Sequence, residues 1–469
     1  MISPITPYRP VLLLSQTGLP LWDEVQAARF PQTLLRYRND RAAQTVGLET
    51  LPDTDWIAHF GGFTPLPGNQ PYPLALRYHG HQFRHYNPDL GDGRGFLFAQ
   101  LYDNRNRLLD LGTKGSGTTP WSRGGDGRLT LKGGVREVLA TAMLDALGVP
   151  TSKSFSLIET GEALMRGDEP SPTRASVLVR LSHSHIRFGT FERLAYLNDA
   201  DTMRDLVDFT IANYYPDCAD AARLFDVVVS ASARLAAQWM AAGFVHGVLN
   251  TDNMSLTGES FDYGPYRFLP HYDPVFTAAY FDHNRLYAYG RQPDAVLWNL
   301  GQLGRCLTLI TDSEALVESL NAFSKRYQSE LEVAICARLN VRPQDDNADL
   351  VAAFYELAAT VRVDGSFEGI FYDWFGGTIS ENRALSGPRV SLYSGDYFED
   401  FYSVLKTYEA ADPGKLNHPR FQQSDPETLL IDEIETIWTD ISAEDDWTKF
   451  NTKLARIDIY RQALNLTAQ

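Results

Sequence analysis

The chain has 469 residues, of which 44% are hydrophobic and 22% are charged, and its formal net charge at pH 7 is −17. This length is sufficient for two lobes or domains, and the composition is that of a globular protein. The acidic balance argues against nucleic acid as the main partner, because a phosphate backbone is bound by clustered Lys and Arg side chains. A small anion can still bind where the site itself is locally basic.

Cysteine usage and hydropathy indicate the compartment. Cys218, Cys306 and Cys336 form no Cys-x-x-Cys pair, which argues against a zinc site and favours a reducing compartment. The apolar run Val11–Leu14 is too short for a signal peptide, and no apolar run approaches the ~20 residues of a membrane span. We therefore expect a cytoplasmic protein with neither a membrane nor a nucleic acid as partner.

The first third of the chain predicts short elements followed by a hairpin and a helix. Residues 1–75 are rich in proline and turn signals, and we expect them to wrap a later core. Two strand-like runs, 95–103 and 108–115, flank a polar turn and predict a hairpin. Residues 131–148 have apolar positions at helical spacing and end on a glycine, which predicts a helix. The strand-like runs SFSLIET, ALMRG and ASVLVRLS follow it.

The rest of the chain is predicted to be mainly helical. A long amphipathic helix over 226–244 leads directly into FVHGVLNTDNMSLTGESFDYG at 244–264. Residues 253–264 within that segment indicate a tight hairpin with TGES at its turn. Helical periodicity returns over 294–365, and the last hundred residues are acidic, as is typical of solvated helix faces and loops.

The segment 244–264 carries residue types suited to metal and proton chemistry. Mg²⁺ prefers oxygen ligands and usually takes only one or two protein groups beside water and phosphates. Asn253 and Asp262 are candidate ligands of this kind, and the alternative is that both cap turns. Asp252 is a candidate general base, with an Asx-turn residue as the alternative.

The same segment resembles the catalytic core of kinases. Those enzymes place a His, an Asp two residues on, an Asn five beyond it and then a metal-binding Asp-Phe-Gly. His246, Asn253 and Asp262 match this order, whereas Val248 stands where the catalytic Asp would be. Valine cannot accept a proton, so the chain is either an inactive kinase or a kinase-like scaffold with other chemistry.

Upstream residues resemble the phosphate-binding part of a kinase. Lys114 follows a predicted strand and Glu137 lies on the next predicted helix, where the pair would fix the ammonium toward a phosphate. Alone, either residue is more often a surface residue. Arg180 and Arg187 are candidates for bidentate phosphate binding, with structural salt bridges as an equally weighted alternative.

Two loops that combine glycine with arginine flank Lys114. Glycine lets backbone amides approach an anion, and arginine supplies a planar fork of donors. Gly91, Gly93 and Arg94 lie in the loop 90–95. Asp126 and Gly127 lie in the loop 122–134. Each loop alone is more often an ordinary turn, but two such loops flanking the same lysine favour an anion-binding role.

Five long motifs resemble the selenoprotein O (SelO) family. They are YHGHQFRHYNPDLGDGRG, DLGTKGSGTTPWSRGGDGRLTLKGGVREVLATAMLDALGVPT, HIRFGTFE, FVHGVLNTDNMSLTGESFDYGPY and YDPVF. The resemblance covers about residues 76–293 and weakens after about residue 385. It implies an α+β, protein-kinase-like fold of two lobes, with a β-rich N-lobe at 76–200 and a mainly helical C-lobe at 201–385. Extensions would occupy 1–75 and 386–469.

The resemblance also implies an activity. Members of the family are pseudokinases that act as protein adenylyltransferases (AMPylators): they bind ATP inverted relative to kinases, transfer AMP to Ser, Thr or Tyr hydroxyls and release pyrophosphate. We therefore expect ATP as substrate, Mg²⁺ or Mn²⁺ as metal, and proteins, this chain included, as acceptors. The implied roles are phosphate contact by Lys114, Arg180 and Arg187, nucleotide binding by Gly91, Gly93, Arg94, Asp126, Gly127 and Asp262, orientation of Lys114 by Glu137, metal binding by Asn253 and Asp262, and proton acceptance by Asp252.

Three other functions remain open on the same scaffold. One is a protein or small-molecule phosphotransferase with Asp252 as its base, and another is a protein UMP transferase. The third is a catalytically silent nucleotide-binding scaffold. Retention of Lys114, Glu137, Asn253 and Asp262 argues against the third, because a silent scaffold needs no metal ligands.

Overall fold

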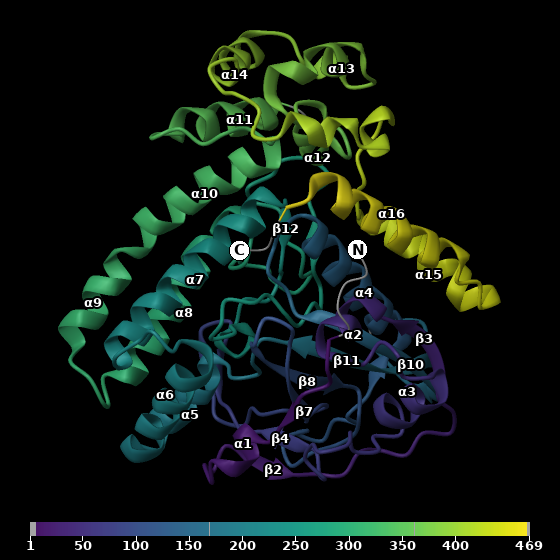
Figure 1. Cartoon of the computed structure of the whole chain (residues 1–469), viewed down its shortest axis with the longest axis vertical. Coiled ribbons are helices and arrows are strands. Elements are labelled where there is room, and N and C mark those ends of the chain that lie inside the picture. The colour runs from purple at the N-terminus through teal and green to yellow at the C-terminus, as the bar shows by residue number, and fades with distance from the viewer. Residues whose placement is uncertain (1–5, 168, 361, 467–469) are drawn as a thin grey trace.

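The computed structural model describes residues 6–167, 169–360 and 362–466, and it has a mixed α/β architecture (Figure 1). The strands gather in the lower half of the view, and the long helices lie above and to one side of them. Among the described residues, no helix has both the length and the apolar character needed to cross a membrane.

One antiparallel sheet dominates the first 182 residues. Within the described chain it has nine strands in the order β2-β4-β7-β8-β11-β10-β3, with β1 added to β7 and β9 to β11. Its members are β1 (Pro10–Val11), β2 (Trp22–Glu24), β3 (Leu34–Arg38), β4 (Leu74–Leu76), β7 (Leu97–Tyr102), β8 (Leu108–Lys114), β9 (Leu129–Thr130), β10 (Lys153–Leu164) and β11 (Thr173–Ser182). Because β2 and β3 lie at opposite ends of this order, residues 1–75 contribute strands to both ends of the sheet.

The predicted hairpin is confirmed, whereas one strand boundary is wrong. β7 and β8 pair antiparallel, with Tyr102 opposite Leu108. SFSLIET and the start of ALMRG belong to a single strand, β10, and not to two. Its pairing with β11 is irregular between Glu159 and Ala163, and this irregularity accounts for the apparent break in the sequence pattern. Two small pairs complete the strands: β5 (Gly80–Gln82) with β6 (His85–Asn87), and β12 (Phe244–Val245) with β13 (Arg267–Phe268).

Helices make up most of the remainder. They are α1 (Leu13–Gln16), α2 (Asp40–Val46), α3 (Asp53–Phe60), α4 (Leu131–Ala146), α5 (Phe188–Tyr196), α6 (Ala200–Tyr214), α7 (Ala221–Ala241), α8 (Gln292–Leu307), α9 (Ser313–Asn321), α10 (Phe323–Leu339), α11 (Ala348–Thr360), α12 (Ser366–Asp373), α13 (Glu381–Ser386), α14 (Asp396–Leu405), α15 (Ile431–Glu444) and α16 (Thr448–Leu464). The helix predicted over 131–148 is confirmed as α4. The helix predicted over 226–244 starts earlier, at Ala221, because the Asp220 side chain caps it by accepting from the backbone N–H of Arg223.

Different helices pack on the two faces of the sheet. Side chains alternate between the faces along each strand. Leu111 of β8 and Val179 of β11 pack in the core that includes α2 and α3, whereas Leu178 packs in the core that includes α4. By the same alternation Lys114 and Arg180 lie on the α4 face, so the sheet directs both cations to one side.

The hairpin predicted over 253–264 is wrong. The structure has a 3₁₀ turn at Thr251–Asn253 followed by a loop, and β12 pairs with β13 beyond the segment. Isolated bridges from Arg187 to Ser255 and from Thr151 to Ser260 hold the loop. The loop is therefore held to two other segments of the chain, and the contacts between its own backbone groups are short-range turns.

The helices α15 and α16 pack back onto the sheet side of the molecule. In Figure 1 they are yellow and lie beside α4. Ile457 and Tyr460 of α16 share a core with Val135 and Leu139 of α4. A salt bridge of 2.7 Å joins Lys132 Nζ of α4 to Glu435 Oε2 of α15. The outer side of α4 is thereby covered by residues from the last part of the chain.

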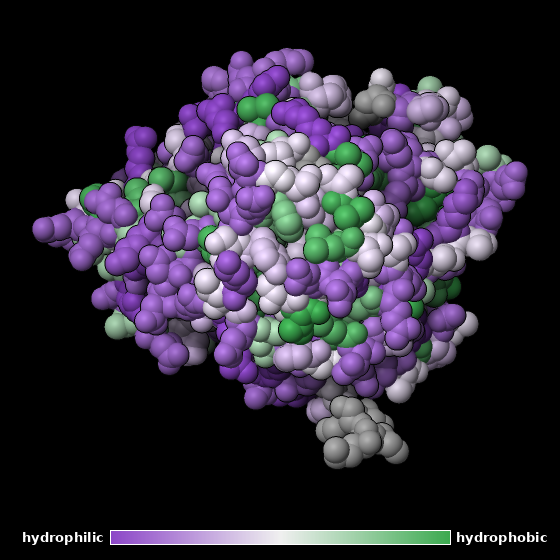
Figure 2. Space-filling view, turned by 90° about the horizontal axis from the view of Figure 1, so that it is seen from above, coloured by the Kyte–Doolittle hydropathy of each residue, from purple (hydrophilic) through white to green (hydrophobic). Residues whose placement is uncertain are grey.

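The end of the molecule that is uppermost in Figure 1 is built from α11 to α14. Seen from above it is mostly hydrophilic, with a group of apolar side chains near the middle of the face (Figure 2). Exposed apolar residues in this part of the chain include Ile379, Val390 and Tyr397. The candidate active site lies on other elements of the fold.

Candidate active site

The end of β8 places Lys114 between two carboxylates. Its Nζ donates to Glu137 Oε1 on α4 and to Asp262 Oδ1 in the loop between β12 and β13. Arg180 Nη1 on β11 lies 3.5 Å from the same Asp262 oxygen. Lys114, Glu137 and Arg180 are 6%, 1% and 4% exposed, so these charges interact where water screens them poorly. The structure therefore brings four predicted site residues into one cluster.

The charge of Asp262 is fixed by this cluster. Burial alone would raise the pKa of its carboxyl group, but the positive charges of Lys114, Arg180 and Arg187 hold that pKa well below its ordinary value. Asp262 is therefore ionised at all physiological pH values. Its backbone φ of +65° is unusual for a residue other than glycine, which marks the position as one fixed by its surroundings.

Arg187 stands at the N-terminus of α5 and joins the cluster to the 3₁₀ turn that carries Asp252. Its Nη1 donates to the Asp252 carbonyl at 2.8 Å, and its Nη2 lies 3.4 Å from Asp92 Oδ1. Its guanidinium lies over the rings of Tyr78 and Phe261, at 4.6 and 4.9 Å from their centroids. These contacts fix the plane of the guanidinium.

Three buried guanidinium nitrogens of the site are left without a hydrogen bond. Within the described chain they are Nε and Nη1 of Arg180 and Nε of Arg187. A buried donor without a partner is costly, so such groups in a native protein require an explanation. A bound anion with several oxygens, such as a polyphosphate, would supply the missing acceptors.

The surroundings of Asp252 shift its pKa in the direction opposite to that of Asp262. It lies in the 3₁₀ turn beneath β5, where a Cβ atom at Gly80 would stand 3.1 Å from its Oδ1. Burial raises the pKa of Asp252 to about 7, against the opposing charge of Arg187. Its Oδ1 has no partner among the described residues. A carboxylate with a pKa near neutrality and a free oxygen is suited to general-base catalysis.

Backbone carbonyls orient the next two residues of the site. Asn253 Nδ2 donates to the carbonyl of Val248 at 3.0 Å, which leaves the amide oxygen of Asn253 as an acceptor. His246 Nε2 donates to the carbonyl of Phe261 at 2.9 Å, and burial lowers the pKa of His246 so that it is neutral at pH 7. His246 thus anchors the residue before Asp262.

The oxygen donors present fit Mg²⁺. Among the residues that the structure describes, no group of three or more His, Cys, Asp or Glu side chains is arranged to hold a metal ion. Asn253 and Asp262 offer two oxygen donors, which is the number Mg²⁺ commonly takes from protein when water and phosphates complete its coordination.

The two glycine-containing loops pack directly on each other. A Cβ at Gly91 would overlap the side chain of Trp121, and one at Gly93 would lie 2.8 Å from the Trp121 carbonyl oxygen. Gly127 has φ +67°, and a Cβ there would overlap the Gly117 backbone. Glycine is therefore required at all three positions by close packing, whatever these loops bind.

The charged residues of the two loops differ in their placement. Arg94 is exposed, and its charge contributes to the low pKa of Asp262. Asp126 instead pairs with Arg166 at 2.8 Å on the exposed edge of its loop. Asp126 thus makes its side-chain ion pair away from both the Lys114 cluster and Asp252.

The structure adds residues that the sequence reasoning missed. Asp92 contacts Arg187, and it lies between Gly91 and Gly93, so the loop motif already contained it. Glu192 is buried and accepts from the Thr251 hydroxyl at 2.8 Å, which supports the turn that carries Asp252. Glu192 is the last residue of the motif HIRFGTFE, but that motif does not reveal its contact, because Thr251 is distant in the sequence.

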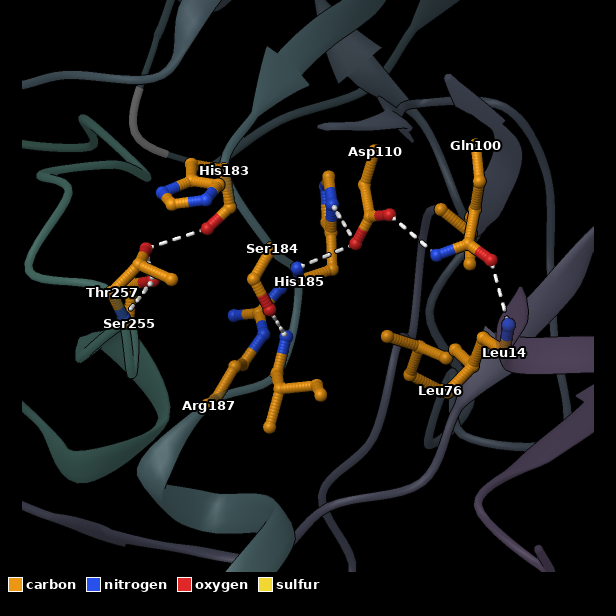
Figure 3. A network of polar contacts seen from close by, with 12 residues as sticks. Leu14, Leu76, Gln100, Asp110, His183, Ser184, His185, Arg187, Ser255 and Thr257 are labelled. Carbon is orange, nitrogen blue, oxygen red and sulfur yellow. Dashed lines mark hydrogen bonds and ion pairs between the residues drawn. The ribbon is translucent and has the colours of Figure 1, made fainter. Parts of the chain in front are cut away.

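A buried polar chain holds the turn that precedes Arg187 (Figure 3). Gln100 Oε1 accepts from the backbone N–H of Leu14 at 2.7 Å, and Gln100 Nε2 donates to Asp110 Oδ1 at 2.8 Å. Asp110 Oδ2 in turn accepts from the backbone N–H of His185 at 2.8 Å. Ser184 between these elements has φ +98°, so the turn is strained and is held by its partners.

Comparison with known proteins identifies the family of this chain. Residues 7–458 match the sequence model of the family described as protein adenylyltransferase SelO, well beyond the motifs at 76–293 and past residue 385. The protein nucleotidyltransferase YdiU of Synechocystis is 45% identical over 475 residues, which cover 96% of this chain and 97% of the relative. The protein of the same name from Gloeobacter violaceus is 44% identical over 463 residues (96% and 94%), and that of Vibrio cholerae is 38% identical over 343 residues (71% and 69%). This chain therefore belongs to the SelO family of protein nucleotidyltransferases and is an enzyme of that class.

Proposed function

We propose that this protein transfers AMP from ATP to the hydroxyl group of Ser, Thr or Tyr side chains of proteins and releases pyrophosphate. The observation that carries the proposal is geometric: Lys114 and Arg180 converge on Asp262, and Arg187 contacts the carbonyl of Asp252 in the neighbouring turn. Two acids in such different surroundings commonly divide electrostatic and proton-transfer roles.

The cations of the site bind and neutralise the phosphates. Lys114, Arg180 and Arg187 contact them, and the unpaired Nε groups of the two arginines are the available donors. Glu137 orients Lys114 through their ion pair. Their charges stabilise the pyrophosphate as it leaves. Asn253 and Asp262 hold Mg²⁺, or Mn²⁺, which when bound neutralises further phosphate charge.

Asp252 accepts the proton of the acceptor hydroxyl. As the proton moves to the carboxylate, the hydroxyl oxygen forms a bond to the α-phosphorus. The bond from the α-phosphorus to the oxygen bridging to the β-phosphorus breaks, and its electron pair leaves with pyrophosphate. The pKa near 7 suits this step, because the base is then both substantially ionised and able to hold a proton.

A kinase-like arrangement with inverted ATP accommodates these roles. The pairing of a strand lysine with a helix glutamate supports this assignment, as does the order His246, Asn253, Asp262. In this arrangement the N-lobe comprises residues 76–200 and the C-lobe residues 201–385, with extensions at 1–75 and 386–469. Gly91, Gly93, Arg94 and Gly127 line the nucleotide. Asp126 can line the nucleotide with them only if its salt bridge with Arg166 breaks.

Labelled ATP separates this function from its alternatives. The purified protein is incubated with Mg²⁺ and either α-labelled or γ-labelled ATP, with itself and a cell extract as acceptors, and its intact mass is then measured. We expect the α label alone to enter protein, with an adenylyl mass increase. Transfer of the γ label would instead show a phosphotransferase, and preference for UTP in the same assay would show a UMP transferase. Absence of all labels from a folded, ATP-binding protein would overturn the proposal.

A further inference from the structure

The tip of the β5–β6 hairpin carries residues that the turn itself does not favour. Phe83 and Arg84 form the two-residue connection, with φ values of +49° and +65°. Turns of this shape prefer Asn or Gly, because larger side chains are strained at positive φ. A phenylalanine and an arginine here are therefore explained by what their side chains contact rather than by the turn.

Phe83 begins a continuous run of aromatic rings that reaches the surface. Its ring lies 5.9 Å from that of Phe281, and the rings of Phe281 and Tyr280 are 5.1 Å apart. Tyr280 is 78% exposed and Phe281 is 42% exposed, so the outer half of the run faces solvent. Exposed aromatic groups in contact with one another are unusual outside binding surfaces.

This run is attached to the loop that carries the proposed base. The backbone N–H of Phe83 donates to Asn250 Oδ1 at 3.0 Å, and the Tyr287 hydroxyl donates to the same oxygen at 2.8 Å. Asn250 precedes Asp252 by two residues, and Gly80, at the start of the same hairpin, packs against Asp252. The exposed rings therefore lie beside the place where an acceptor hydroxyl must arrive.

The two chain segments that carry the rings are basic, although the chain has a net charge of −17. Residues 80–87 contain no acid, and residues 279–291 contain only Asp282. Asp282 is buried and its two oxygens accept from the backbone N–H groups of Leu286 and Tyr287. Arg84 and Arg285 are exposed, and within the described chain neither forms a salt bridge. The guanidinium of Arg84 lies over the ring of Trp298, 5.4 Å from its centroid.

We propose that Phe83, Arg84, Tyr280, Phe281 and Arg285 form the acceptor-docking surface of this enzyme. The surface takes a protein segment that carries an apolar side chain and Asp or Glu residues close to the modified hydroxyl. Apolar contact with the rings provides affinity, and the two arginines favour an acidic segment over a basic one. This inference rests on the proposed function, because it names the class of acceptor that the site modifies.

Binding of two fluorescent peptides tests the surface directly. Both contain one serine between leucine and phenylalanine, and they differ only in having Glu or Lys at every flanking position. Fluorescence anisotropy should show the Glu peptide binding the wild-type protein at least about tenfold more tightly than the Lys peptide. Phe281→Ala should weaken binding of the Glu peptide at least about fivefold, and the double variant Arg84→Glu, Arg285→Glu should abolish the preference for it.

A matched control and a second readout complete the test. Tyr397→Ala removes a 53% exposed aromatic ring on α14, outside this surface, and should bind both peptides as the wild type does. ATP binding, measured by titration, should be unchanged in all variants. Equal binding of the two peptides by the wild type, or unchanged binding of the Glu peptide by Phe281→Ala, would overturn the docking surface.

Transfer from α-labelled ATP to the same peptides separates the two proposals. Selective peptide binding without transfer of the α label would overturn the proposed function and leave the surface as a peptide-binding site. Transfer of the α label with no preference between the peptides would support the function and overturn the docking surface.

Discussion

Asp262 and Asp252 lie ten residues apart in the chain, yet their surroundings shift their pKa values in opposite directions. Asp262 receives the charges of Lys114, Arg180 and Arg187, which keep its pKa well below the ordinary value. Asp252 is shielded from water beneath β5, and its pKa rises to about 7. One carboxylate is therefore a permanent charge, whereas the other exchanges a proton near neutral pH.

The difference shows how a kinase-like loop can lose its usual base and still have one. Val248 contributes only a backbone carbonyl, which orients Asn253. In the proposed mechanism the base is Asp252, which lies buried beneath the β5–β6 hairpin. The following substitutions test this division of roles.

Replacing Asp262 should have the largest effect. Asp262→Ala removes a metal ligand and leaves Lys114 and Arg180 without their shared counter-ion, so transfer should fall by more than about 10³-fold. The measurement is incorporation of α-labelled ATP, with thermal unfolding as a control for folding. Transfer within tenfold of the wild-type rate would remove Asp262 from the metal site.

Asp252→Asn should slow transfer while leaving ATP binding intact. The amide has the same size but cannot accept the proton, so we expect kcat to fall by about 10²–10⁴-fold. The dissociation constant for ATP, measured by titration, should change by less than about threefold. A loss confined to ATP affinity would assign Asp252 to nucleotide binding and leave the base unassigned.

Lys114→Ala should affect both binding and stability. It leaves Glu137 buried without its cation, which costs about 3 kcal/mol or more in free energy of unfolding, and it should weaken ATP binding at least about tenfold. Urea denaturation and ATP titration measure the two effects. Lys132→Ala is the matched control, because its partly exposed pair with Glu435 should contribute less than about 1 kcal/mol.

The pH dependence should distinguish Asp252 from Asp262. Transfer should increase as pH rises through about 7, because the base must be ionised. Stability should move the other way: between pH 3.8 and about 7 the folded state retains a proton that the unfolded state has lost. The free energy of unfolding relative to Asp252→Asn should therefore decline over that range, by up to about 4 kcal/mol. Parallel curves for the two proteins would show that Asp252 is not shifted.

The smallest effect is expected from the polar chain behind Arg187. In Asp110→Asn an amide N–H must face either Gln100 Nε2 or the His185 backbone N–H, which are both donors, at a cost of about 1–3 kcal/mol. The KM for ATP should rise about threefold to tenfold with little change in kcat.

A second substitution provides the control for this chain. In the double variant Gln100→Glu, Asp110→Asn, the new carboxylate at position 100 accepts both from the backbone N–H of Leu14 and from the new amide at position 110. The oxygen of that amide accepts from the backbone N–H of His185, so every donor of the chain again has an acceptor. The KM should return close to that of the wild type. A persistent defect in the double variant would mean that Asp110 acts otherwise than by holding the turn.

Much of the site was predictable because its residues lie in recognisable local elements. The hairpin that ends on Lys114 and the helix that carries Glu137 follow from turn chemistry and periodicity, and the structure joins them as expected. Contacts made across the fold were not predictable in the same way. The pairing of Asp126 with Arg166 and the support of Thr251 by Glu192 depend on residues far apart in sequence.

The wrong prediction of a hairpin over 253–264 also results from contacts between distant segments. Its residues have turn and strand propensities, but their backbone groups pair with Thr151 and Arg187. Local propensity cannot show that a distant segment offers better partners. The raised pKa of Asp252 was likewise hidden, because it depends on the burial that β5 provides.

The packing of α16 against α4 has a consequence for how the enzyme is made. Residues 131–146 are synthesised early, whereas 448–464, which cover their outer side, are synthesised late. Chains are made from the N-terminus, and contacts between distant segments form only when both are present. The helix that holds Glu137 therefore lacks this cover until residues 448–464 have been made.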